Sequence, residues 1–136
     1  MLDHKHILVS GTVKNPIKDE EILKDWFKRL VKNVDMKIVT GPHGKYVPTP
    51  GNEGLTGACC IETSHCSIHI WDSVEPPMIK FDLYSCKCFK PETVLEMLGE
   101  MDPIQLHWTL IDRNNLYEVN KLDEGHVIGN IDQVVS

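Results

Sequence analysis

The hydrophobic pattern of the chain begins strand-like and then becomes helix-like. Over residues 4–13 apolar and polar side chains alternate, with Ile7 and Val9 on the same face, which is typical of a half-buried β-strand. Over residues 18–33 the apolar side chains recur at helical spacing, and the stripe they form consists of Ile22, Leu23, Trp26, Phe27, Leu30 and Val31. Such a stripe predicts an amphipathic helix whose apolar side packs against a sheet.

Further strand patterns fill the middle of the chain and are followed by a second helix. Short apolar or alternating runs predict strands at residues 35–40, 55–62, 64–71, 77–85 and 104–110. Pro91 suits the first turn of a helix, and the apolar residues after it recur at helical spacing. This order of elements predicts an α+β two-layer sandwich, with a mainly antiparallel sheet and the helices on one of its faces.

Two segments lack both patterns. Residues 41–54 contain four glycines and three prolines, which predicts a loop, and a loop of ~14 residues inside a compact domain is often functional. From Asn114 onward the pattern fades into Asp, Asn and Gly, so we expect residues 114–136 to form a mobile or arm-like tail. The length is that of one domain, and we expect residues 1–136 to form a single unit.

Composition and charge narrow the function classes. The chain has 136 residues and a net charge of −6, so neither nucleic acid nor an anionic membrane surface is an expected partner. No apolar run approaches the ~20 residues of a membrane helix, and the amino terminus lacks the apolar core of a secretory signal. Five cysteines, an odd number, favour free thiols over disulfides. We therefore expect a cytoplasmic protein whose ligand is a small molecule.

Nucleophilic and titratable side chains gather between Glu62 and Trp71. Alternation along the strand at 64–71 separates an apolar face, made of Cys66, Ile68 and Ile70, from a polar face, made of His65, Ser67, His69 and Trp71. The same alternation in the next strand puts Cys86 on a polar face. We therefore expect a hydroxyl, an imidazole and a thiol to converge on this face.

A site that combines Ser64 with His69 requires an irregular backbone between them. Ser64 and His69 are five residues apart, so a regular strand would put them on opposite faces. A bulge or bend between Glu62 and His65 is required, and strained backbone of that kind is common beside active sites. Each residue alone also has an ordinary structural explanation, because a strand hydroxyl, a hydrogen-bonded histidine and a packed thiol are all common. Only the joint order and spacing of the three residues favour a catalytic role over these structural ones.

A zinc site is the rival interpretation of the same segment. Two histidines in His65-x-x-x-His69 and two cysteines in Cys86-x-Cys88 supply four ligands, all of types that zinc accepts. On a strand, however, the two histidines lie about 13 Å apart along the chain, which is too far for one ion. We therefore expect no metal. The histidines near the amino terminus, His4 and His6, are expected at a sheet edge and not as ligands.

The motif Ser64-His65-x-x-Ile68-His69-x-Trp71, followed by Phe81-Asp82-Leu83-Tyr84-Ser85-Cys86, resembles the prokaryotic S-adenosylmethionine decarboxylases. The resemblance covers most of residues 4–112. Members of this family cut their own chain at a serine, which becomes a pyruvoyl cofactor. The resemblance thus implies cleavage between Thr63 and Ser64, with His69 and Cys86 at the other two catalytic positions.

The implied chemistry gives each residue a role. Ser64 Oγ attacks the carbonyl carbon of Thr63 to form an ester, and elimination across Ser64 then leaves a pyruvoyl group. His69 takes the proton from Ser64 Cα, and Thr56 matches a hydroxyl that assists this processing. The pyruvoyl carbonyl forms a Schiff base with the substrate amine. This Schiff base draws electrons from the bond between the substrate Cα and its carboxylate, so that carbon dioxide leaves. Cys86 then returns a proton to the substrate Cα.

The resemblance also implies a substrate and a partner. Tyr46 takes the place of an aromatic residue that stacks on adenine, and Trp71-Asp72 stands where the family has Trp-Pro-Glu, whose carboxylate contacts the ribose. The family forms homodimers through the sheet face that lacks helices, with both active sites at the interface. The implied product supplies aminopropyl groups for spermidine synthesis.

Two alternatives remain open from the sequence. The shifted carboxylate at Asp72 leaves room for the same cofactor chemistry on a smaller amino acid, such as ornithine or arginine. Thr63 stands where the family has a glutamate, which leaves room for an unprocessed, non-catalytic homologue that acts as a regulatory partner. A β-branched residue at the attacked carbonyl would slow cleavage.

Overall fold

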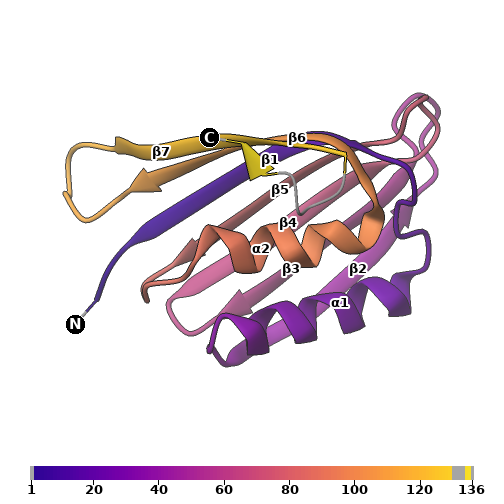
Figure 1. Ribbon diagram of the computed structural model, residues 1–136. Helices are drawn as coiled ribbons and strands as arrows, with labels where there is room; N and C mark the ends of the chain where they lie inside the picture. Colours follow the sequence, from indigo (N-terminus) through magenta and orange to yellow (C-terminus); the bar gives the residue numbers. More distant parts are fainter. Residues whose placement is uncertain (1, 130–133, 136) are drawn as a thin grey trace.

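A single antiparallel sheet dominates the structure. The computed structural model describes residues 2–129 and the backbone of 134–135. Within these residues eight strands pair in the order β2-β3-β4-β5-β1-β6-β7-β8, and every neighbouring pair is antiparallel (Figure 1). The strands are β1 (Lys5–Val13), β2 (Ile38–Val47), β3 (Gly54–Ile61), β4 (Ser64–Trp71), β5 (Met78–Ser85), β6 (Pro103–Asp112), β7 (Asn120–Ile128) and β8 (Val134–Val135).

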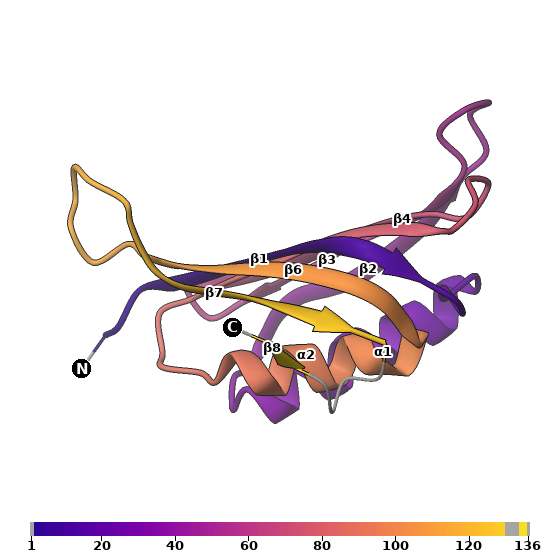
Figure 2. The ribbon, with the colours of Figure 1, turned by 45° about the horizontal axis from the view of Figure 1, so that its top comes forward.

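Both helices of the described chain, α1 (Glu20–Asn33) and α2 (Pro91–Leu98), lie on one face of the sheet (Figure 2). The predicted α+β two-layer sandwich is therefore confirmed. No described element covers the opposite face, which we call the open face. Its central side chains include those of His6, Leu8, Ser10, His65, Ser67, His69, Trp71, Lys80, Asp82, Tyr84, His107 and Thr109, as the strand registers place them. No helix of the described residues is long and apolar enough to span a membrane.

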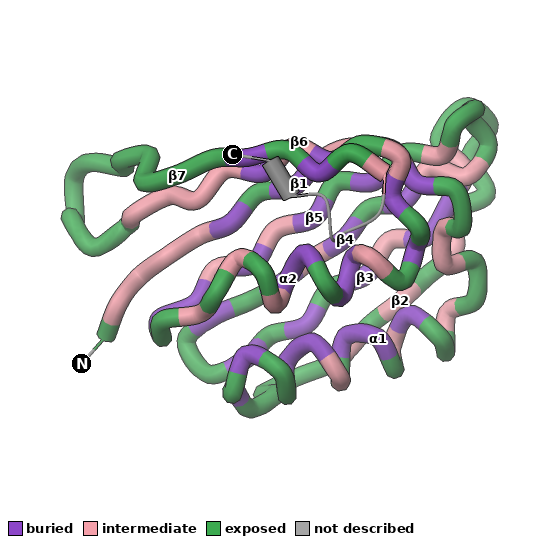
Figure 3. Tube along the Cα trace, in the orientation of Figure 1, coloured by how far each residue is buried: buried purple, intermediate pink, exposed green. Residues whose placement is uncertain are grey.

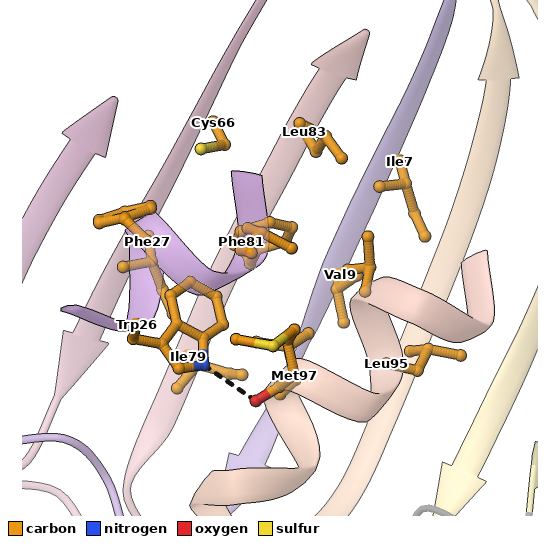
Figure 4. Close-up of a cluster of buried hydrophobic side chains, with 14 of the residues drawn as sticks. Ile7, Val9, Trp26, Phe27, Cys66, Ile79, Phe81, Leu83, Leu95 and Met97 are labelled. Atoms are coloured by element: carbon orange, nitrogen blue, oxygen red, sulfur yellow. Dashed lines mark hydrogen bonds between the residues drawn. The ribbon is translucent and has the colours of Figure 1, made fainter. Parts of the chain in front are cut away.

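Helix α1 begins and packs as its sequence predicts. The side chain of Asp19 accepts hydrogen bonds from the backbone N–H groups of Glu21 and Ile22, which caps the first turn. Its apolar stripe is buried against the sheet except for Ile22, which is exposed, and Trp26 is fully buried. The indole N–H of Trp26 donates to the carbonyl oxygen of Met97 in α2 at 2.9 Å, which joins the two helices (Figure 4).

The two faces of the central strands differ as the alternation predicts. Along β4 the residues Cys66, Ile68 and Ile70 are buried beneath the helices, and those between them are half-buried or exposed (Figure 3). The core continues into β5 through Phe81 and Leu83. The burial of apolar area on this face stabilises the sheet, and the polar groups of β4 other than Ser64 are left on the open face.

Strand β2 extends further than predicted. It runs to Val47, so the expected loop at residues 41–54 shrinks to the segment between β2 and β3. Gly41 and Pro42 lie inside the strand, where its pairing with β3 shifts register. Because β2 is the edge strand of the sheet, a proline and an irregular ladder are tolerated there. Glycine and proline content alone therefore gave the wrong boundary.

The expected tail is also wrong over much of its length. Residues 120–128 form β7, which pairs with β6, and Val127 is fully buried. Gly125 lies against the Trp108 ring, where an added Cβ would come within 2.6 Å of the indole nitrogen. The position thus requires glycine, which resembles a loop residue in the sequence. Residues 130–133 and 136, the rest of the expected tail, lie outside the described part.

The first strand is central and not at an edge. β1 pairs with β5 on one side and with β6 on the other, so His6 stands in the middle of the open face. The expectation that His6 is an edge residue was wrong, because hydrophobic periodicity does not reveal the pairing order of strands.

Candidate functional site

The scissile position implied by the sequence lies in a tight turn. Glu62 and Thr63 alone connect β3 to β4, and Ile61 pairs directly with Ser64 across the hairpin. Thr63 has a φ of +49°, in the left-handed region that a β-branched residue rarely adopts. Backbone strain of this kind costs about 1–3 kcal/mol. It falls on the residue whose carbonyl carbon Ser64 would attack.

The bend that we expected between Glu62 and His65 is this turn, and it does not alter the faces of β4. The pairing of β4 with β3 and β5 is regular from Ser64 to Trp71. Ser64 consequently lies on the buried face, with 9% of its surface exposed. His69 lies on the open face.

Ser64 and Cys86 are held together. The backbone N–H of Cys86 donates to Ser64 Oγ at 2.9 Å. β5 ends at Ser85, so Cys86 leaves the alternation of that strand and turns toward the hairpin. Its side chain is 5% exposed, which corrects the expectation that it lies on a polar sheet face. The hydroxyl and the thiol of the candidate set therefore do converge.

The thiol of Cys86 lies in a polar contact network. Its sulfur is 2.8 Å from the hydroxyl oxygen of Thr63 and 3.5 Å from the carbonyl oxygen of Glu62. Hydrogen bonds from Thr63 and then Ser64 lower the pKa of Cys86 and outweigh the opposing effect of burial. A thiol with a lowered pKa is a better proton donor and a better nucleophile than an ordinary buried cysteine.

A cavity of about 490 Å³ opens beside this thiol. It is lined by Leu2, Met36, Val39, Glu62, Thr63, Cys86 and Lys87. Its size is in the range of small-molecule sites, and most of its wall is apolar with a few polar groups. A substrate in this cavity would touch both the turn and the thiol. We call Thr63, Ser64 and Cys86 the processing group.

His69 lies toward the other end of β4. It is the cross-strand partner of Thr56 in β3, and the Thr56 hydroxyl hydrogen-bonds to His69 Nδ1 at 3.1 Å. The Trp71 ring lies on the same face, with its centroid 6.1 Å from that of His69. The imidazole is therefore oriented by a hydroxyl, as a general base requires.

The three candidate substrate-binding residues lie at the same end as His69. Tyr46 Oη donates to Asp72 Oδ1 at 3.1 Å. Burial and this hydrogen bond raise the pKa of Tyr46, so the phenol stays protonated. Trp71 Nε1 donates to Asn52 Oδ1 at 2.6 Å. We call Tyr46, Thr56, His69, Trp71 and Asp72 the histidine group.

The structure thus divides the candidate residues between two places in the chain. Five residues of regular strand separate Ser64 from His69 by about 16 Å, and their side chains leave opposite faces of the sheet. One chain brings hydroxyl and thiol together but does not bring the imidazole to them.

The open face holds further polar residues that the sequence analysis did not select as site residues. A cavity of about 330 Å³ beside His69 is lined in part by Ser67, Lys80, Asp82 and His107. These residues come from β4, β5 and β6. Strand alternation gives the face of each one, but only the pairing order shows that they are neighbours, which explains why the sequence did not reveal them.

The chain is similar to known proteins over most of its length. Residues 5–114 match the sequence model of the S-adenosylmethionine decarboxylase family. The S-adenosylmethionine decarboxylase proenzyme of Clostridium botulinum strain Hall is 32% identical over 98 residues, which are 71% of this chain and 79% of the relative. The proenzymes of strains Langeland and Loch Maree are 31% and 29% identical over the same lengths. The matched range 5–114 contains every residue of the processing group and the histidine group.

Proposed function

The chain belongs to the S-adenosylmethionine decarboxylase family, and from that premise we propose that it is a pyruvoyl-dependent decarboxylase that makes its own cofactor by cleavage between Thr63 and Ser64. The observation that carries the proposal is the strained turn at Thr63, next to a serine that shares a hydrogen bond with Cys86. Its substrate is S-adenosylmethionine, and its product supplies aminopropyl groups for spermidine.

Cleavage follows from the chemistry of the processing group. Ser64 Oγ attacks the carbonyl carbon of Thr63, and the C–N bond between the two residues breaks as the ester forms. This reaction frees Thr63 from its left-handed conformation, so the strain favours it. Removal of the Ser64 Cα proton then expels the Thr63 carboxylate. The dehydroalanine that this elimination leaves at residue 64 tautomerises to an imine. Water hydrolyses the imine, which releases ammonia and leaves the pyruvoyl group on residue 64.

The residues around Ser64 suit that group. When formed, the pyruvoyl carbonyl supplies the electron-withdrawing chemistry that decarboxylation needs. Cys86 is held next to residue 64 through its backbone N–H, and its thiol borders the cavity that admits substrate. A thiol with a lowered pKa is able to deliver the proton that the substrate Cα must regain.

The position of His69 supports a homodimer. His69 does not reach Ser64 of its own chain, since the two lie about 16 Å apart along β4. If His69 removes the Cα proton, it comes from a second copy. Two open faces packed about a two-fold axis, with their strands in opposite directions, would bring the histidine group of one protomer toward the processing group of its partner.

The substrate assignment is tested by carbon dioxide release. In this arrangement Trp71 and Asp72 accompany His69 and contact the adenosine half of S-adenosylmethionine. Tyr46, on the helix side of β2, is linked to them by its hydrogen bond to Asp72. We expect cleaved protein to release carbon dioxide from S-adenosylmethionine and not from ornithine or arginine. If the protein decarboxylates ornithine or arginine but not S-adenosylmethionine, the substrate assignment is wrong and only the proposed pyruvoyl chemistry stands.

Intact-mass spectrometry tests the cleavage itself. The 15.5 kDa chain is expected to yield fragments 1–63 and 64–136, the second with a carbonyl that reduction traps. Ser64→Ala should remain at full mass because no hydroxyl is left for the attack. Ser67→Ala is the matched control, since it removes the neighbouring serine on the open face and should cleave normally. Wild-type protein that stays intact after prolonged incubation, without a trappable carbonyl, would favour the unprocessed regulatory homologue.

A further inference from the structure

Three potential metal ligands converge on the open face, apart from both groups described above. They are His6 of β1, His65 of β4 and Asp82 of β5, and their ligand atoms lie within 4.8 Å of one another. We propose that these three residues form a binding site for a divalent transition-metal ion of the zinc class. This inference does not rest on the proposed decarboxylase function.

The distances are close to those of a metal site. His6 Nε2 lies 2.8 Å from Asp82 Oδ2, and His65 Nε2 lies 3.8 Å from the same oxygen. Zinc holds nitrogen and oxygen ligands at about 2.0–2.2 Å, so tetrahedral ligand atoms are about 3.4 Å apart. Small side-chain rotations would therefore open the triangle around an ion. Two imidazoles and one carboxylate leave the fourth position for solvent.

The sheet preorganises this triangle. Tyr84 pairs with His6 on one side and with His65 on the other, so the two histidines flank β5 in one row. Asp82 lies two residues along β5, on the same face and between them. Ligands on adjacent strands of a regular sheet are held more precisely than ligands on loops.

A hydrogen-bonded shell supports the carboxylate. Ser67 donates its hydroxyl to Asp82 Oδ1, which leaves Oδ2 directed at the two histidines. Such partners orient metal ligands and strengthen binding. His65 is the most exposed of the three in the single chain, at 49%.

Arg113 is a neighbour that opposes an ion. Its guanidinium donates to His6 Nδ1 at 3.2 Å and lies over the Tyr84 ring. A neutral His6 that accepts at Nδ1 carries its proton on Nε2, whereas metal binding at Nε2 requires the proton on Nδ1. Arg113 must therefore turn away, which its exposed position permits. Removal of this side chain should tighten binding.

Calorimetric titration with Zn²⁺ alone tests the site. The Ser64→Ala chain is used beside the wild type, so that the result does not depend on cleavage. We expect one saturable site per chain. His65→Gln and Asp82→Asn should weaken it at least about tenfold, and Arg113→Ala should strengthen it. Thermal unfolding by circular dichroism shows whether each variant is folded, and His65→Gln, at an exposed position, is the safest of them.

His107→Gln is the matched control. His107 lies on the same face and pairs with a carboxylate, Glu124, at 3.5 Å, but it is outside the triangle. The control should bind zinc as the parent does. The proposal is overturned if no saturable binding occurs, or if folded His65→Gln and Asp82→Asn bind zinc unchanged. A cobalt-substituted protein whose spectrum shows thiolate ligation would also overturn it, by moving the ion to the cysteines.

Discussion

Thr63 combines two effects at one position of the turn. Its positive φ strains the peptide that precedes Ser64, and its hydroxyl contacts the sulfur of Cys86 at 2.8 Å. A neutral donor of this kind stabilises a thiolate, whereas the glutamate that the family places here would repel one. The substitution therefore changes the acidity of the proposed proton donor as well as the residue at the proposed cleavage point.

Replacement of Thr63 by valine isolates the hydroxyl, because both side chains are β-branched. We expect Thr63→Val to raise the pKa of Cys86, since the largest of the interactions that lower it is lost. The pH profile for alkylation of Cys86, followed by peptide mass spectrometry in the Ser64→Ala background, should move to higher pH. Identical profiles for the two chains would show that Thr63 does not tune the thiol.

The lowered pKa of Cys86 also makes the stability of the fold depend on pH. Because folding lowers the pKa of Cys86, the thiolate's contribution to stability is complete above the ordinary thiol pKa and is lost as the pH falls through the lowered value. Thr63→Val should therefore reduce stability at alkaline pH more than at neutral pH. In turnover, deprotonation of the donor should reduce activity as the pH rises through the same value.

At the scale of elements, the position of a helix was easier to predict from the sequence than the position of a strand. Helix α1 was predictable because its burial stripe repeats over several turns and a capping Asp19 precedes it. Only the first part of β2 was predicted, because the rest of this edge strand tolerates Gly41 and Pro42, and β7 was missed because it buries little besides Gly125 and Val127. Strands are predictable here only where one face packs against a helix.

The hydrogen bond from Trp26 to Met97, which joins the two helices, gives a prediction about stability. Trp26→Phe removes the indole N–H and leaves the carbonyl oxygen of Met97 without its partner in a buried place. We expect a loss of about 1–3 kcal/mol in the free energy of unfolding. Urea denaturation of the intact Ser64→Ala chain measures it. Ile22→Ala, an exposed change in the same helix, should stay within about 0.5 kcal/mol, and an equal loss in both variants would contradict the assignment.

At the scale of the whole molecule, the sequence identified the candidate residues but not their distribution. The motif predicted Ser64, His69 and Cys86 together, and alternation already put the first two on opposite faces. A local bend was expected to bring them together, whereas the structure keeps β4 regular and confines the turn to Glu62 and Thr63. Alternation within one chain does not encode a contact with a second copy, so the proposed sharing of the site rests on the family resemblance and on the separation of Ser64 from His69.

Mixing two inactive variants decides whether the site is shared. Ser64→Ala retains His69, and His69→Ala retains Ser64, so a mixed dimer holds one complete site if each site takes its imidazole from the partner. Random pairing makes about half of the dimers mixed. We therefore expect up to about half of the His69→Ala chains to be cleaved after co-expression, as read by intact mass.

The control replaces the first variant with Ser64→Ala/His69→Ala, which has no imidazole to give and should restore nothing. If His69→Ala cleaves slowly alone, the same mixtures are read by carbon dioxide release, because a mixed dimer still gains one complete site. Cleavage and turnover that stay at the level of the separate variants would mean that His69 acts within its own chain. The hairpin at Thr63 would then have to move through about 16 Å during the reaction, a distance set by five residues of strand.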